Sequence, residues 1–294
     1  MKKPQDRASD APQNAPQQAA QGAMNGQGAI SRMIPIRVLI PNMITLLVLA
    51  AGLTAIRFAV EGRLEHSVLS IAAAAVLDGL DGRIARLLKG ASHFGAELDS
   101  LADFISFGCA PALVLYFWTM SDVSTFGWLA ALALAFAAAL RLARFNVMAE
   151  DLTKPDWMKG FFTGVPAPAG AMLALLPINA YLAGLPKFAG HAIVVALFTV
   201  FVAALMVSRL PTPSGKGKGG PIPRERVIPI VALMILVAVL LVNHTFMTVT
   251  AITVGYLAYL PFGWRNYNAL LAADRAKADR AKADRAKQEN GPAA

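Results

Sequence analysis

The sequence predicts an all-α polytopic membrane protein with about eight transmembrane helices. Of its 294 residues, 56% are hydrophobic and only 15% are charged, and the mean hydropathy is +0.52. Apolar runs long enough to cross a bilayer recur along most of the chain. A net charge of +9 would suggest nucleic-acid binding in a soluble protein, but here the basic residues flank apolar segments. We therefore expect membrane lipids, and no nucleic acid, as partners.

The two ends of the chain differ from its apolar centre. Residues 1–30 are rich in Gln, Ala, Asn and Pro without an apolar run, which predicts a disordered cytoplasmic tail and no secretory signal. Residues 31–262 hold the apolar segments and are expected to form one transmembrane domain. Residues 263–294 repeat Ala-Asp-Arg-Ala-Lys three times. Because a five-residue period makes no amphipathic face, we expect a charged cytoplasmic tail, helical or disordered.

Eight apolar segments are expected to cross the membrane, and polar loops join them. The single cysteine, Cys109, lies within an apolar run and excludes an intrachain disulfide. The segment 211–226 is rich in Gly, Pro and Lys, which is typical of a flexible loop. The expected spans are residues 37–60, 64–88, 95–119, 124–147, 162–184, 189–208, 227–243 and 245–262.

Basic residues are concentrated in alternate loops, and this sets the expected orientation. By the positive-inside rule, these loops and both termini are cytoplasmic. On the opposite side the exceptions are Arg57, Arg63 and Lys187. The basic loops follow the second, fourth and sixth spans. Lys89, together with Arg83 and Arg86 at the end of the second span, marks the first of them, and the other two contain Lys154, Lys159, Lys216, Lys218, Arg224 and Arg226.

Four aspartates lie where the second and third spans meet. Asp78 and Asp81 fall roughly 60° apart on one helix face, and Asp99 and Asp103 fall roughly 40° apart on another. If residues 87–94 form a short turn, the two helices are antiparallel neighbours and all four carboxylates face one another. Such carboxylates repel unless a cation neutralises them, and oxygen ligands without a His or Cys cluster suit Mg²⁺ or Mn²⁺. Ionisable groups within apolar spans also indicate a functional site.

The pattern D-x-x-D-G-x-x-A-R-x8-G-x3-D-x3-D, which runs from Asp78 to Asp103, is complete and resembles the signature of the CDP-alcohol phosphotransferases. The resemblance implies the fold of that family, a catalytic role for the transmembrane domain and a homodimer. It implies two divalent cations, Mg²⁺ or Mn²⁺, that clamp a pyrophosphate. Asp78, Asp81 and Asp99 resemble the metal ligands. Asp103 resembles a ligand that also takes the proton of the attacking hydroxyl.

The same resemblance assigns contacts to the cytidine nucleotide. Asn42 and Thr45 on the first span resemble a nucleotide-binding pair, although from the residues alone they could satisfy backbone groups near the helix start. Gly82 and Ser92 fall at positions that contact the CDP moiety, and Arg86 at a position that bridges phosphates. A cap on the third span is the other interpretation of Ser92. Close helix packing is the other interpretation of the glycines.

Three further stretches resemble bacterial-type phosphatidylserine synthases: residues 98–112, 140–146 and 164–171. They imply CDP-diacylglycerol and L-serine as substrates, phosphatidylserine and CMP as products, and the bacterial inner membrane with a cytoplasmic active site. Arg141 and Arg144 share one helix face at i,i+3 spacing and are candidates for binding the serine carboxylate. Interfacial anchoring by snorkelling is an equally good interpretation of both arginines. The C-terminal third of the chain carries little that discriminates.

Two alternative functions stay open at this level. The first keeps the chemistry and changes the acceptor to glycerol 3-phosphate, inositol phosphate or choline. The second is a cation transporter in which the aspartates form an ion pathway. A transporter would often carry internal repeats with interrupted helices in corresponding halves. The sequence contains one aspartate cluster and no second copy, which favours the enzyme.

Overall fold

The computed structural model describes residues 36–88, 92–149, 161–187, 189–208, 210–213 and 224–289. The chain divides into two units, residues 1–36 and 37–294, and the arrangement described below is that of the second unit. The predicted disordered tail at residues 1–30 lies outside the described residues. Also outside them are five of the bases used to predict the orientation: Lys89, Lys154, Lys159, Lys216 and Lys218.

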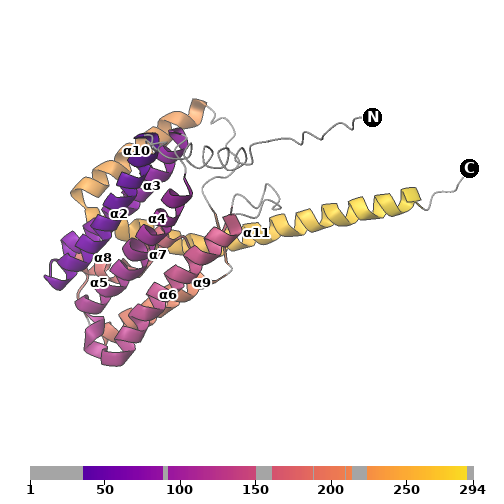
Figure 1. Cartoon of the computed structure of the whole chain (residues 1–294). Coiled ribbons are helices and arrows are strands. Elements are labelled where there is room, and N and C mark those ends of the chain that lie inside the picture. The colour runs from indigo at the N-terminus through magenta and orange to yellow at the C-terminus, as the bar shows by residue number, and fades with distance from the viewer. Residues whose placement is uncertain are drawn as a thin grey trace, which may run out of the picture. The chain divides into compact units, whose positions relative to one another are not determined.

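Helices α2 (Ile36–Val60) and α3 (Leu64–Leu87) confirm the first two predicted helices to within one residue. They form an antiparallel hairpin, and Ser67 Oγ donates a hydrogen bond of 2.8 Å from α3 to the Ala55 carbonyl of α2. Because α3 returns along α2, its last turns carry the first two aspartates back to the level of the first turns of α2 (Figure 1).

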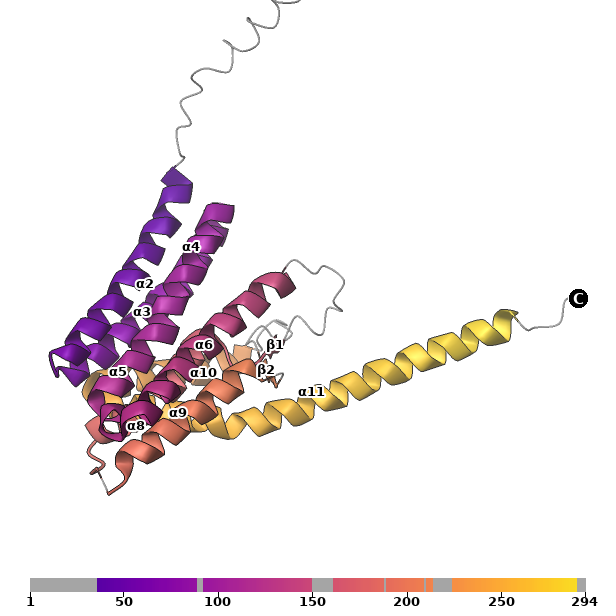
Figure 2. The ribbon, with the colours of Figure 1, turned by 60° about the horizontal axis from the view of Figure 1, so that its bottom comes forward.

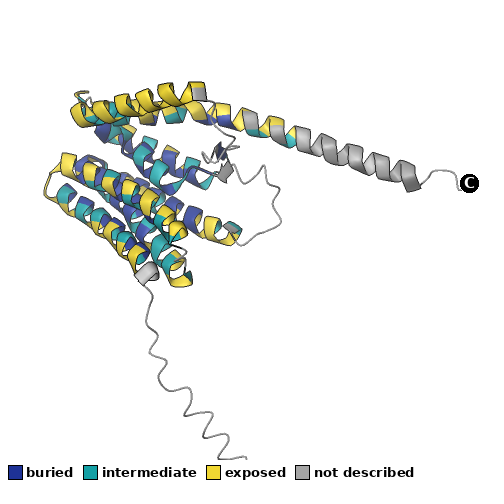
Figure 3. Cartoon of the chain, turned by 90° about the horizontal axis from the view of Figure 1, so that it is seen from above, coloured by how far each residue is buried: buried dark blue, intermediate teal, exposed yellow. Residues whose placement is uncertain are grey.

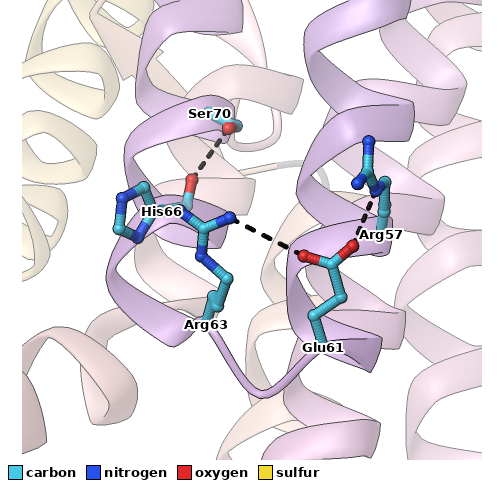
Figure 4. A network of polar contacts seen from close by, with 5 residues as sticks. All are labelled: Arg57, Glu61, Arg63, His66 and Ser70. Atoms are coloured by element: carbon cyan, nitrogen blue, oxygen red, sulfur yellow. Dashed lines mark hydrogen bonds and ion pairs between the residues drawn. The ribbon is translucent and has the colours of Figure 1, made fainter.

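The turn between α2 and α3 holds two of the basic residues that are exceptions to the charge asymmetry. Glu61 accepts a hydrogen bond of 2.7 Å from Arg57 Nε and forms a longer ion pair of 3.8 Å with Arg63 (Figure 4). The Arg63 guanidinium also stacks 4.6 Å above the Phe58 ring. Exposed pairs of this kind add little stability. Both arginines therefore have a local ion-pair partner, the carboxylate of Glu61.

The third predicted span is one continuous helical run with a change of pitch directly after Asp103. It consists of α4 (His93–Asp103), the π-helical segment η1 (Phe104–Cys109) and α5 (Ala110–Trp118). Segments of π-helix occur frequently at functional sites. A hydrogen bond of 3.0 Å from Ser106 Oγ to the Val48 carbonyl fastens the π-helical segment to α2. The aspartates of α4 are therefore held against the first hairpin.

Helices α6 (Ser124–Ala149) and α9 (His191–Val207) confirm the fourth and sixth predicted helices. A short 3₁₀ turn, η2 (Met120–Val123), leads into α6. The two helices run side by side (Figure 2). Their small and branched residues, such as Ala138 and Val202, are fully buried between the elements of the core. The end of α6 lies on the same side of the bundle as the aspartates, because Asn146 near that end bonds to Ser100 of α4.

The fifth predicted span, residues 162–184, is not one continuous helix. The structure divides it into a strand β1 (Phe161–Thr163) and two short helices, α7 (Ala167–Ala174) and α8 (Leu176–Leu182). Strand β1 pairs antiparallel with β2 (Pro211–Pro213), so the all-α prediction needs this two-stranded exception. Gly164 ends β1 with φ +79°, and a Cβ atom there would lie 2.5 Å from the Met206 carbonyl oxygen. Only glycine fits both conditions.

Helices α10 (Arg224–Asn243) and α11 (Thr245–Glu289) follow the seventh and eighth predicted spans. The apolar window of α10 has no buried residue, and its surface is exposed along its length (Figure 3). We interpret this surface as lipid-facing. Helix α11 does not stop at residue 262 but continues to Glu289, so the predicted charged tail is helical over most of its length.

The prediction of a polytopic membrane protein is confirmed, but the count of eight spans is not. Five stretches of the described residues are long and apolar enough to cross a membrane. Helix α3 carries charged residues in its last turns, the fifth segment is broken, and α9 has only 17 residues. The five stretches are Leu39–Val60, His93–Trp118, Met120–Met148, Glu225–Asn243 and Thr245–Ala269.

Candidate active site

Three of the four predicted aspartates converge. Asp78 from α3 and Asp99 and Asp103 from α4 each present one carboxylate oxygen, and these three oxygens lie within 4.8 Å of one another. The three side chains are neither fully buried nor exposed. The geometric expectation that two neighbouring antiparallel helices bring carboxylates face to face is met for these three.

The fourth aspartate, Asp81, lies beside the three-carboxylate cluster rather than inside it. Its side chain is only 5% exposed, and Oδ2 accepts a hydrogen bond of 3.1 Å from Thr45 Oγ1 of α2. Electrostatic interactions still join Asp81 to Asp78 and Asp99. The Thr45 hydroxyl also lies 3.1 Å from the Pro41 carbonyl, so it contacts a backbone acceptor of α2 as well as Asp81. It holds one carboxylate oxygen of Asp81 on the side of the site that faces α2.

The cluster has the donor set that a hard divalent cation requires. Its ligand atoms are carboxylate oxygens alone, which suit Mg²⁺ or Mn²⁺. Asp103 Oδ1 is buried and has no hydrogen-bond partner among the described residues. A buried charged oxygen without a partner is unfavourable unless a cation or a proton neutralises it. The residues present therefore fit a bound divalent cation.

A cavity of about 170 Å³ lies next to Asp81 and Asp99, between the first turns of α2, the last turns of α3 and the start of α4. Four residues that the family resemblance assigned to the nucleotide line it together. The lining residues are Pro41, Asn42, Thr45, Asp81, Gly82, Ala85, Ser92, Gly95, Ala96 and Asp99. The sequence separates these residues by more than fifty positions, and the hairpin brings them to one place.

The glycines around this cavity differ in what surrounds them. A Cβ atom at Gly95 would lie 2.9 Å from Asn42 Oδ1, so Gly95 permits close packing of α4 on α2. By contrast, a Cβ atom at Gly79 or Gly82 would meet no protein atom within 4 Å. The packing interpretation therefore describes Gly95. Gly82 leaves its backbone open to the cavity.

Ser92 and Arg86 each have a local partner. The Ser92 side chain caps α4 by accepting a hydrogen bond of 3.0 Å from the Gly95 backbone N–H, and it also lines the cavity. Both interpretations of Ser92 are thus compatible with its position. Arg86 Nε donates to the Gly82 carbonyl at 2.9 Å, and its side chain is exposed outside the lining of the cavity. Its contact with phosphate stays a prediction.

Comparison with known proteins agrees with this geometry. Residues 38–204 match the model of the CDP-alcohol phosphatidyltransferase family. The chain belongs to the CDP-alcohol phosphatidyltransferase family. The matched segment contains the aspartates, the cavity and the helices from α2 to most of α9, so the resemblance in the sequence pattern is confirmed.

Relatives of this family member carry a more specific description. It is 37% identical over 238 residues to a Mycobacterium leprae protein described as a CDP-diacylglycerol–serine O-phosphatidyltransferase, covering 81% of this chain and 78% of the relative. A Mycobacterium tuberculosis protein with the same description is 37% identical over 230 residues, which are 78% of this chain and 79% of the relative. A Bacillus subtilis protein with the same description is 34% identical over 178 residues, which cover 60% of this chain and 91% of the relative.

The two arginines of α6 have different surroundings in this CDP-alcohol phosphatidyltransferase. Arg141 is 8% exposed, interacts electrostatically with Asp103 and Asp78, and lies 5.7 Å from the centre of the Phe145 ring. Arg144 Nη1 instead donates a hydrogen bond of 2.8 Å to the Val207 carbonyl at the end of α9. Arg141 thus adjoins the aspartates, whereas Arg144 has one donor committed to holding α6 against α9.

Sequence reasoning missed two polar contributions to the site. Asn146 Nδ2 donates a hydrogen bond of 2.9 Å to Ser100 Oγ. This bond links the end of α6 to α4 at a position between Asp99 and Asp103. Tyr256 of α11 interacts electrostatically with Arg141. A tyrosine within an apolar run gives no motif, and the only available signal was that its hydroxyl needs a partner when buried.

Proposed function

We propose that this protein transfers the phosphatidyl group of CDP-diacylglycerol to L-serine and gives phosphatidylserine and CMP. The observation that carries the proposal is the position of three converging carboxylates beside a cavity lined by Asn42, Thr45, Gly82 and Ser92. The descriptions of the mycobacterial and Bacillus relatives support serine as the acceptor. For this reaction the site must position the serine hydroxyl, supply a base and neutralise the phosphate charge.

Asp78, Asp81, Asp99 and Asp103 are proposed to hold two divalent cations, Mg²⁺ or Mn²⁺. When bound, these ions neutralise the charge of the diphosphate and orient it for in-line displacement. Asn42, Thr45 and Gly82 would bind the cytidine nucleotide in the cavity, together with Ser92. Arg86 would reach the phosphates with its exposed guanidinium.

The proposed reaction is a displacement at the phosphorus that carries diacylglycerol. The serine hydroxyl oxygen forms a new bond to this phosphorus, and the bond from the phosphorus to the CMP oxygen breaks. Asp103 takes the proton of the attacking hydroxyl. Its buried Oδ1 atom, which has no hydrogen-bond partner among the described residues, supports this role.

Arg141 is the stronger of the two candidates for binding the serine carboxylate. Its side chain is buried and adjoins the proposed base electrostatically, which would bring a bound amino acid close to Asp103. Arg144 is proposed to act mainly by anchoring α6 to the end of α9, because one of its donors is already bonded to Val207.

We further propose that the active site faces the cytoplasm of a bacterial inner membrane. The bases after the second, fourth and sixth predicted spans support this orientation. Residues 31–262 would form the transmembrane catalytic domain, flanked by cytoplasmic tails at 1–30 and 263–294. The resemblance to the family supports a homodimer as the working assembly.

The test is CMP release by the purified protein with CDP-diacylglycerol and a panel of acceptors: L-serine, glycerol 3-phosphate, inositol phosphate and choline. We expect release to require L-serine and the lipid product to be phosphatidylserine by mass spectrometry. Asp103→Asn should lower the rate by roughly 10²- to 10⁴-fold, which is the usual contribution of a general base.

The matched control is Asp122→Asn, because Asp122 is an exposed aspartate in the turn at the other end of the helices. It should leave the rate unchanged. CMP release with a different acceptor, but not with serine, would support the phosphatidyl transfer and refute serine as the acceptor. No release with any acceptor would refute the transferase assignment as a whole.

A further inference from the structure

Helix α11 lies beyond the segment that matches the family model, yet one of its faces packs into the protein core. Thr253 and Leu260 are buried on this face, and Tyr256 and Leu257 pack partly buried between them. The spacing i, i+3, i+4, i+7 is that of a helix stripe directed at a core. The same helix contacts α8 and β2. The C-terminal third is therefore built into the domain that carries the aspartates.

Arg141 is a buried cation without an ion-pair partner in the described part of the chain. Its side chain is 8% exposed, and no carboxylate of the described residues lies within 4.0 Å of it. Its electrostatic interactions are with Asp103, Tyr256 and Asp78. Burying a charge is unfavourable unless a counter-charge pairs with it. Arg141 is therefore suited to an anionic group that arrives with a ligand.

Tyr256 adds a second donor next to this cation. Its hydroxyl oxygen is buried and makes no hydrogen bond within the described residues. The phenol, on α11, interacts electrostatically with Arg141 of α6. A buried hydroxyl without a partner is unusual in a folded protein, and a ligand that accepts a hydrogen bond would satisfy it.

We propose that Tyr256 and Arg141 together form the subsite for the carboxylate of the acceptor, so that α11 completes a serine site that the family segment leaves open. This inference rests on the proposed transfer to L-serine. The guanidinium would pair with the carboxylate, and the phenol O–H would donate to one of its oxygens. Because Arg141 also adjoins Asp103, an amino acid held here presents its hydroxyl beside the proposed base.

The subsite also accounts for discrimination among acceptors. Choline carries a cation and no carboxylate, so it would leave the Tyr256 hydroxyl unsatisfied and be repelled by Arg141. An acceptor without a charged group gains nothing from either residue. A site with buried polar groups of this kind rejects analogues that lack the matching group.

The test uses Tyr256→Phe, which keeps the ring and removes only the hydroxyl, in the full-length enzyme. A hydrogen bond to a charged group corresponds to a change of roughly 10- to 100-fold in affinity. The KM for L-serine should rise by that factor, whereas the KM for CDP-diacylglycerol should stay unchanged. The preference for L-serine over L-serinamide, in which an amide replaces the carboxylate, should fall by a similar factor. KM does not depend on the amount of folded enzyme, so a reduced yield leaves the result interpretable.

Tyr259→Phe is the matched control, because Tyr259 is one turn along the same helix and 47% exposed. It should leave both KM values and the preference unchanged. An unchanged serine KM and an unchanged preference over serinamide in Tyr256→Phe would overturn the inference, even if the variant is less stable. The wild-type enzyme tests the proposed function separately. If it releases CMP with another acceptor and not with serine, the proposed transfer to serine is wrong, whatever the Tyr256→Phe variant shows.

Discussion

The cavity between α2, α3 and α4 makes a sharp prediction about two glycines that each follow an aspartate. Gly79 follows Asp78 and Gly82 follows Asp81, both in α3, and a Cβ atom at either would meet no protein atom within 4 Å. Only Gly82 lines the cavity. Gly82→Ala and Gly79→Ala therefore add the same methyl group to the same helix, and they differ only in whether it enters the cavity.

The expected magnitude follows from the size of the cavity. A methyl group takes roughly 30 Å³, similar to one water molecule in the liquid. At Gly82 it would project into the cavity, because no protein atom lies within 4 Å of that position. Crowding a well-packed site by one such group costs about 1–3 kcal/mol. If the nucleotide occupies the cavity, Gly82→Ala should raise the KM for CDP-diacylglycerol roughly 5- to 150-fold. Gly79→Ala should leave it unchanged.

Neither variant should unfold the protein. Alanine is favoured over glycine inside a helix by roughly 0.5–1 kcal/mol, so both variants should melt at the same temperature as the wild type or slightly above it. The assay is CMP release at saturating serine with CDP-diacylglycerol varied, together with thermal unfolding in detergent. Equal KM values in the two variants would refute the reasoning, because the effect would then not depend on the cavity.

Three further predictions test the cation, the arginines and the orientation. Removal of divalent ions by a chelator should abolish CMP release, and added Mg²⁺ or Mn²⁺ should restore it; full turnover in excess chelator would refute the cation site. Arg141→Ala should raise the serine KM roughly 10- to 100-fold. Arg144→Ala should lower the melting temperature with little change in the serine KM. The reverse pattern would show that Arg144 binds serine and Arg141 anchors the helix. With Cys109 replaced, Lys216→Cys should be labelled only from the cytoplasm and Ser121→Cys only from the opposite side; equal labelling would contradict the orientation.

The carboxylate cluster shows how far spacing alone can lead. Intervals of three and four residues predict aspartates on single helix faces, and the three-carboxylate cluster follows once α3 and α4 are neighbours. Spacing does not determine the direction of each side chain. Asp81 is turned toward α2 by the hydroxyl of Thr45, which is thirty-six residues earlier in the chain. That contact depends on the hairpin packing, so only the tertiary structure provides it.

The broken fifth segment shows the limit of hydropathy as a predictor. Residues 162–184 are apolar enough to suggest one span, because an apolar run does not reveal backbone pairing with a distant segment. The pairing of Phe161–Thr163 with Pro211–Pro213, and the position of Gly164 against the Met206 carbonyl, join residues that are 42 to 52 positions apart in the sequence. The same limit applies to the charged tail after residue 262, because the Ala-Asp-Arg-Ala-Lys repeat is compatible with a helix and with disorder. The structure shows a helix that continues to Glu289.

The sequence by itself determined the membrane class and the family, because these depend on local composition and on a motif with fixed intervals. It also indicated the aspartates as a candidate site and, through the family resemblance alone, the candidate nucleotide contacts. The tertiary structure decided which of two neighbouring arginines adjoins the carboxylates. Arg141 and Arg144 are equivalent in pattern, but α9 offers the Val207 carbonyl to Arg144, whereas Arg141 interacts electrostatically with Asp103 and Tyr256. The partner of a buried charge is set by which elements pack together, and no interval in the sequence encodes it.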